Sequence, residues 1–203
     1  MKEDFYKGVY ANTYRTAWSI YPKILRKINL KKSDKVLDAG CGNGELGKYL
    51  REFNLTGIDF NKKSVEEARK TKRYKKVIDA NIYNLPFIDK EFDETVSIEV
   101  FQYLKDPEKA FSEIKRVTKK RIIISSANYR WFRIKVIFSK AFRRDYKRML
   151  EHENMITDVF FKKIAKDHNL KLELKYISNK FDFLRNLFGK FFASEIIGVF
   201  TIK

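Results

Sequence analysis

Three glycines at alternate positions, Gly40, Gly42 and Gly44, have the spacing in this chain that points most directly to ligand binding. They lie in the stretch KVLDAGCGNGELGKYL, after a short apolar segment, and Asp38 stands two residues before the first of them. Glycine tolerates positive φ and lets a ligand approach the backbone closely. The spacing is not the G-x-G-x-x-G of dinucleotide-binding loops, and no Lys-Ser/Thr pair follows as in a phosphate-binding loop. A carboxylate at the mouth of such a loop would repel a pyrophosphate and favours a ligand that carries positive charge.

Further candidate residues follow the next two apolar segments. Asp59 ends the segment NLTGID, 19 positions after Gly40, and an acid at this place in nucleotide-binding sheets hydrogen-bonds ribose hydroxyls. Phe60 beside it can lie against a purine, and the stretch 79–81, Asp-Ala-Asn, can accept a hydrogen bond from an adenine amino group. The pattern therefore describes an adenosine with a cationic tail that lacks phosphate, and S-adenosylmethionine fits this description.

The elements that must position these residues alternate between strand and helix. Capping and periodicity predict helices at 45–53, from Asn61, from Asp106-Pro107 to about Val117, and from about Thr157. Strands are predicted at 36–37, 54–59, 75–79, 92–98, 121–126, 170–177 and 196–202. This order predicts an α/β fold: a doubly wound, mostly parallel, seven-stranded Rossmann-like sheet with an antiparallel C-terminal edge hairpin.

Length and composition indicate one folded domain over residues 1–203. Hydrophobic residues make up 44% of the chain and charged residues 34%, which is typical of a globular protein. We expect an N-terminal helical cap at 1–30, rich in aromatics from Tyr6 to Tyr21, and lid-like insertions at 127–150 and 178–193. The opening stretch MKEDFYKGVY lacks the apolar core of a signal peptide, so a cytoplasmic location is expected. One cysteine and two histidines indicate no metal site.

Five blocks that occur in order between about residues 35 and 128 carry a family resemblance. They are VLDAGCGNGELG, LTGIDF, DANIYNLPF, FDETVSIEVFQYL and DPEKAFSEIKRV. Together they resemble the class I S-adenosylmethionine-dependent methyltransferases, and most closely the group that contains the ubiquinone/menaquinone-biosynthesis enzymes and many small-molecule methyltransferases. Before and after these blocks the resemblance is weak.

The resemblance implies which part of the cofactor each matching residue would contact. The acid and the backbone of the glycine loop would hold the methionine part, and the acid after the second strand would take both ribose hydroxyls. Residues after the second and third strands would contact the adenine, and one residue past the fourth strand would line the pocket near the reactive methyl. In chain order, the implied cofactor-binding residues are Asp38, Gly40, Cys41, Gly42, Gly44, Asp59, Phe60, Asp79, Ala80 and Glu99.

A catalytic base is needed only if the methyl acceptor must lose a proton, because alignment can supply much of the rate of an in-line displacement. The sequence offers three candidates, Glu99, Tyr103 and His152. Many relatives in the family have a His where this chain has Tyr103, and a Pro-Gly-Gly turn where it has TKKR at 118–121. His152 also has a structural interpretation, in which it caps or satisfies a loop.

The region most informative about the methyl acceptor is a basic segment at 130–148, which contains eight Lys/Arg and one acid. The net charge of the whole chain is +18. The aromatic and basic residues of the segment recur at helical spacing, so it can form a lid, lie on an anionic membrane or track a phosphate backbone. The leading hypothesis is a methyltransferase for a small or lipid-like molecule, cytoplasmic or peripheral at the membrane. The alternatives are an RNA methyltransferase that grips RNA through 130–148, and a non-catalytic S-adenosylmethionine-binding regulatory protein.

Overall fold

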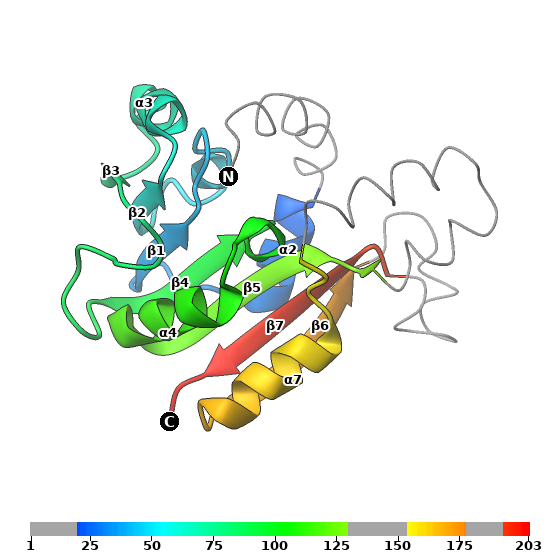
Figure 1. The fold of residues 1–203 in the computed structure, drawn as a ribbon. Coiled ribbons are helices and arrows are strands. Elements are labelled where there is room, and N and C mark those ends of the chain that lie inside the picture. Colours follow the sequence, from blue (N-terminus) through cyan, green and yellow to red (C-terminus); the bar gives the residue numbers. More distant parts are fainter. Residues whose placement is uncertain (1–19, 130–153, 178–192) are drawn as a thin grey trace.

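The computed structural model describes residues 20–129, 154–177 and 193–203. The described part of the chain contains one seven-stranded sheet in the order β3-β2-β1-β4-β5-β7-β6 (Figure 1). The strands are β1 (Lys35–Ala39), β2 (Asn54–Asp59), β3 (Lys76–Asp79), β4 (Phe92–Ile98), β5 (Thr118–Ala127), β6 (Lys171–Ile177) and β7 (Glu195–Thr201). The helices are α2 (Tyr21–Ile28), α3 (Lys62–Lys70), α4 (Pro107–Val117) and α7 (Asp158–Asp167), with short 3-10 helices η1 (Leu46–Lys48) and η2 (Phe101–Tyr103).

Strands β1 to β5 are all parallel, and β7 is antiparallel to both of its neighbours. β7 lies between β5 and β6, so β6 forms the edge of the sheet (Figure 1). The predicted fold class, including the antiparallel pair at the C-terminal edge, is therefore confirmed. Because the strands β1 to β5 run the same way, their carboxyl ends meet at one edge, where open α/β sheets bind ligands.

Helices cover both faces of the sheet, as a doubly wound fold requires (Figure 1). α4 and α7 pack on one face through Phe111, Ile114 and Phe161, and α2 packs on the other through Ile24 and Ile28. Adjacent residues of each central strand contribute to opposite layers, since side chains alternate along a strand. Both layers are apolar and fully buried at these positions, and they hold the sheet rigidly under the loops at its carboxyl edge.

Three helices begin where the sequence predicted. The side chains of Asn61, Asp106 and Thr157 accept hydrogen bonds from backbone N–H groups three residues on, at 3.1, 3.0 and 3.4 Å. Each side chain satisfies a donor that the first turn leaves without a partner.

Two local predictions are wrong. Residues 45–53 do not form an α-helix; only η1 is helical, and turns follow it. The N–H of Gly47 donates to the Tyr74 hydroxyl at 3.1 Å, and glycine itself lowers helix propensity. Strand β5 begins at Thr118, directly after α4, and not at residue 121 as predicted; the Thr118 hydroxyl donates to the Ile114 carbonyl at 2.6 Å and closes the helix without a turn.

Several predictions concern residues outside the described ranges. The aromatic cap up to Trp18, the basic segment 130–148, the candidate His152 and most of the insertion 178–193 fall there. Within the described ranges, no helix is both long and apolar enough to cross a membrane.

Candidate cofactor-binding site

The glycine loop takes the backbone form that its sequence predicted. Gly40, Gly42 and Gly44 have φ of +87°, +51° and +84°, values that side chains with a Cβ rarely adopt. The N–H groups of Gly40 and Cys41 both donate to the Ile58 carbonyl, at 2.9 and 2.8 Å. The loop is thereby folded back onto the end of β2, and its bare backbone faces the carboxyl edge of the sheet.

Gly40 is also constrained from outside the loop. A Cβ at this position would collide with the side chain of Val100, which follows β4. Cys41 is buried, and burial raises the pKa of its thiol above the ordinary value. The thiol therefore stays protonated, and this residue contributes its backbone to the site.

Asp59 ties the glycine loop to the start of α3. Its Oδ2 accepts from the N–H of Gly42 at 2.9 Å, and its Oδ1 accepts from the N–H of Asn61 at 2.9 Å. Burial raises the pKa of this carboxyl, while the backbone hydrogen bonds oppose the increase. Each carboxylate oxygen has a second lone pair, so Asp59 can still accept from two ribose hydroxyls while it holds the loop.

Asp38 at the end of β1 is bound to a residue that the sequence analysis did not place in the site. The Tyr74 hydroxyl donates to Asp38 Oδ2 at 2.6 Å. Burial raises the pKa of Asp38 to about 7; the Tyr74 hydrogen bond lowers it and the charge of Asp59 raises it. Among the described residues, no lysine or arginine pairs with either carboxylate. Nothing in the spacing singles out Tyr74, because 36 residues separate it from Asp38.

The residues predicted to contact the adenosine come together at the ends of β2 and β3. Asp59 and Asp79 are partners in the parallel register, and the N–H of Ala80 donates to the Asp59 carbonyl at 3.0 Å. Phe60 is 48% exposed. The structure therefore brings all four predicted adenosine-contacting residues to one place.

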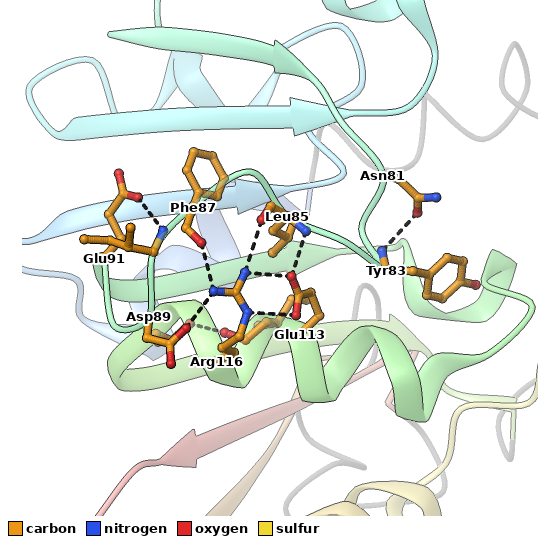
Figure 2. Close-up of polar contacts among 11 residues, drawn as sticks. Asn81, Tyr83, Leu85, Phe87, Asp89, Glu91, Glu113 and Arg116 are labelled. Atoms are coloured by element: carbon orange, nitrogen blue, oxygen red, sulfur yellow. Dashed lines mark hydrogen bonds and ion pairs between the residues drawn. The ribbon is translucent and has the colours of Figure 1, made fainter.

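The loop after β3 is fastened to α4 by Arg116, as Figure 2 shows. Its guanidinium donates to the carbonyls of Leu85 and Phe87 at 3.1 and 2.8 Å and to Asp89 at 2.7 Å. It also forms a two-pronged pair with Glu113, at 2.7 and 2.9 Å, and Glu113 accepts from the N–H of Leu85 at 2.7 Å. This pair was not predicted to have a role, although Glu and Arg at i, i+3 on one helix are a recognisable signal.

Glu99, predicted near the reactive methyl, follows β4 with a left-handed φ of +59°. Its N–H donates to the Ser125 carbonyl at 3.1 Å, and Gln102 Nε2 donates to its Oε2 at 2.9 Å. Its carboxyl lies against that of Glu195, at the start of β7. Glu195 was not predicted from the sequence, in which it is an ordinary polar residue beside an apolar strand. Tyr103 ends η2, and the described residues contain no cluster of His, Cys, Asp and Glu that could hold a metal.

The fold and the site together define a class. A parallel sheet with an antiparallel β7 between β5 and β6, a glycine loop after β1 and an acid at the end of β2 are the features of the class I methyltransferase fold. Residues 37–124 match the family described as Methyltransferase domain. This match, together with the fold, confirms the resemblance of the five sequence blocks to the class I S-adenosylmethionine-dependent methyltransferases.

Similar proteins support the same resemblance. The chain is 35% identical over 98 residues to a malonyl-[acyl-carrier protein] O-methyltransferase of Buchnera aphidicola, covering 47% of this chain and 40% of that protein. A methyltransferase structure from Thermotoga maritima has a TM-score of 0.74 at 18% identity and covers 98% of both chains. Magnesium protoporphyrin IX methyltransferase of Synechocystis, solved with bound S-adenosylmethionine, has a TM-score of 0.62 at 16% identity, over 100% of this chain and 86% of that one. The chain spans 38%, 42% and 61% of the length of the first three curated relatives that it matches.

Proposed function

We propose that this protein transfers the methyl group of S-adenosylmethionine to a small organic acceptor. The observation that carries the proposal is the pair of buried acids, Asp38 and Asp59, which converge on the glycine loop. Neither is paired with a lysine or arginine within the described residues, so the site is built for a ligand that brings positive charge and hydroxyl donors. S-adenosylmethionine has both, in its sulfonium and ammonium groups and in its ribose.

Each residue of the site has a part of the cofactor to hold. Asp38 provides negative charge beside the methionine part, and a bound cation stabilises its ionised form. Asp59 accepts from the ribose hydroxyls, and Phe60 lies against the adenine, whose edge Asp79 and Ala80 contact. The protein contributes position and electrostatics, while the reactive carbon belongs to the cofactor.

The acceptor class is supported by the names of similar proteins. One relative is named for malonyl-[acyl-carrier protein] and one structural neighbour for magnesium protoporphyrin IX. These names favour a small organic acceptor group over a nucleic acid. The RNA and membrane alternatives both depend on the segment 130–148, and a small-molecule acceptor does not.

The test of cofactor binding is calorimetry with S-adenosylmethionine on the wild type and on Asp59→Ala. Loss of the charged hydrogen bonds to ribose should weaken binding by about 2–3 kcal/mol, or about 30- to 160-fold in Kd. Asp167→Ala, a half-exposed acid on α7, is the matched control and should bind like the wild type. No binding to the wild type, or unchanged affinity in a folded Asp59→Ala protein, would refute the proposed function.

A further inference from the structure

Two carboxyl groups meet at the carboxyl edge of the sheet. Glu99 follows β4, and Glu195 begins β7, where it pairs in register with Ala127 and Ile177. The Asn128 amide donates to the Ala193 carbonyl at 2.8 Å. This bond joins the residue after β5 to the segment that leads into β7, and so helps to hold Glu195 in place.

Each carboxyl has one buried oxygen without a hydrogen-bond partner. These atoms are Glu99 Oε1 and Glu195 Oε2. Two adjacent carboxylates repel each other strongly in a buried site, whereas one proton shared between them satisfies both oxygens. Burial raises the pKa of Glu99, and burial together with the charge of Glu99 holds the pKa of Glu195 well above its usual range.

Gln102 decides which of the two carboxyls is the ionised one. Its Nε2 donates to Glu99 at 2.9 Å, and its Oε1 accepts from the Ser126 hydroxyl at 3.1 Å. The amide orientation is therefore set, and its donor stabilises a carboxylate on Glu99. The resting proton belongs on Glu195, and Glu99 is left able to accept a second one.

The backbone places Glu99 close to the cofactor loop. The next residue, Val100, packs against Gly40 so tightly that a Cβ there would collide with it. Glu99 itself has a left-handed φ of +59°, a conformation that is unfavourable for residues other than glycine and that clusters at functional sites. A left-handed backbone, burial and an oxygen without a hydrogen-bond partner thus coincide at Glu99, next to the residue that packs against the glycine loop.

We propose that Glu99 and Glu195 form the proton-accepting site for the methyl acceptor, which is a neutral nucleophile with a hydrogen on its attacking nitrogen or oxygen. This inference rests on the proposed function and specifies its substrate class. It distinguishes neutral phenols, anilines and imidazoles from thiolates and carboxylates, which bring no proton to remove.

The step balances without any further reactant. The acceptor atom attacks the methyl carbon, a carbon–nitrogen or carbon–oxygen bond forms, and the carbon–sulfur bond breaks with its electron pair going to sulfur. The sulfonium thereby becomes a neutral thioether. The proton of the acceptor moves to Glu99, and the carboxyl pair passes from one proton and one negative charge to two protons and no charge.

The first test is infrared spectroscopy of the free protein, which needs neither cofactor nor acceptor. At pH 8, where Asp38 is mostly ionised, the wild type should show a protonated-carboxyl band that Glu195→Gln lacks. The glutamine keeps the shape and donates to Glu99, which then needs no proton. Glu173→Gln, an exposed acid on β6, is the matched control and should keep the band. A wild type and a Glu195→Gln protein with identical carboxyl bands would overturn the inference.

The second test follows formation of S-adenosylhomocysteine with a panel of phenols, anilines, imidazoles, thiols and carboxylates. Transfer should occur to a member of the first three classes. With S-adenosylmethionine at saturation, Glu99→Gln should lower kcat at least about 100-fold, the usual contribution of a general base, and Glu173→Gln should be unaffected. Transfer to none of the first three classes, or an unchanged kcat in Glu99→Gln, would overturn the inference while cofactor binding upheld the proposed function. A wild type that binds no S-adenosylmethionine would overturn both.

Discussion

The buried carboxyl of Asp38 makes the stability of the protein depend on pH even without a bound ligand. It lies in a buried position, held by Tyr74, and its pKa is raised to about 7. The folded protein therefore binds this proton more tightly than the unfolded chain does. Asp38 taken alone makes the free energy of unfolding decrease as the pH rises from about 4 to 7. A bound cationic ligand stabilises the ionised carboxylate and so offsets this loss of stability.

Affinity for S-adenosylmethionine should consequently depend on pH through Asp38. Binding favours the ionised carboxylate, so below pH 7 the affinity should decrease by up to about tenfold per pH unit. The methionine ammonium stays charged throughout this range. Calorimetry between pH 5.5 and 8 measures the slope, and Asp38→Asn should bind more weakly with a nearly flat profile. A wild type whose affinity does not change over this range would show that Asp38 does not face the cationic part of the ligand.

Gly40 offers a second prediction at the residue scale. Gly40→Ala should weaken cofactor binding and lower stability, because a φ of +87° costs a side chain about 1–2 kcal/mol and the new methyl group collides with Val100. Val100→Ala in the same protein should restore part of the loss, since it removes the collision and leaves the φ penalty. Urea unfolding of the two single variants and the double variant measures the coupling. Additive losses would mean that the two residues do not touch.

At the scale of elements, the loop after β3 is shaped by α4 and not by its own turns. Arg116 and Glu113, both on α4, satisfy the backbone of residues 85–87 (Figure 2). The same loop begins at Ala80, which the proposed function places beside the adenine. Under that proposal, the helix on one face of the sheet fixes a ligand-binding segment at its edge.

Arg116→Lys should loosen this loop without unfolding the protein. A lysine keeps the charge but cannot reproduce the fork that bonds two carbonyls and two carboxylates at once. Hydrogen exchange of residues 80–91 should accelerate, and S-adenosylmethionine affinity should decrease by a few-fold. Lys109→Arg, an exposed change on the same helix, serves as the control. Exchange in this loop that matched the wild type would assign its rigidity to other contacts.

The sequence predicted the parts of the site that are local and missed those that join distant segments. Gly40, Asp38 and Asp59 were predicted to lie together because each stands at or just after the end of a predicted strand, and the structure brings them to one edge of the sheet. Tyr74 and Glu195 were missed because their partners lie far along the chain, and only the packed sheet brings them together. The failed helix at 45–53 has the same origin, since Tyr74 takes the N–H of Gly47.

On the scale of the whole molecule, the net charge of +18 affects which macromolecules the protein attracts. It attracts polyanions in general, so a charged surface alone does not define an RNA substrate. Retention of RNA should weaken steeply with salt if phosphates are neutralised. We expect the segment 130–148 to act as a lid, with no specific RNA grip.

The double variant Arg143→Glu/Arg144→Glu tests this expectation. At physiological salt, neither it nor the wild type should retain RNA or float with anionic liposomes. Phe138→Ala/Phe142→Ala should nevertheless impair methyl transfer, because a lid acts through its apolar face. RNA retention by the wild type that the charge reversal abolishes would favour the RNA methyltransferase instead.

The position of β7 has a consequence for the order in which the parts of the site are synthesised on the ribosome. β7 follows every other described strand along the chain, yet it lies between β5 and β6 (Figure 1). The glycine loop, Asp38 and Asp59 are synthesised more than 130 residues before Glu195. A nascent chain can therefore shape its cofactor loop while the second carboxyl of the proton-accepting pair does not yet exist. Under the proposed roles, a growing chain would acquire the ability to hold the methyl donor before the ability to use it.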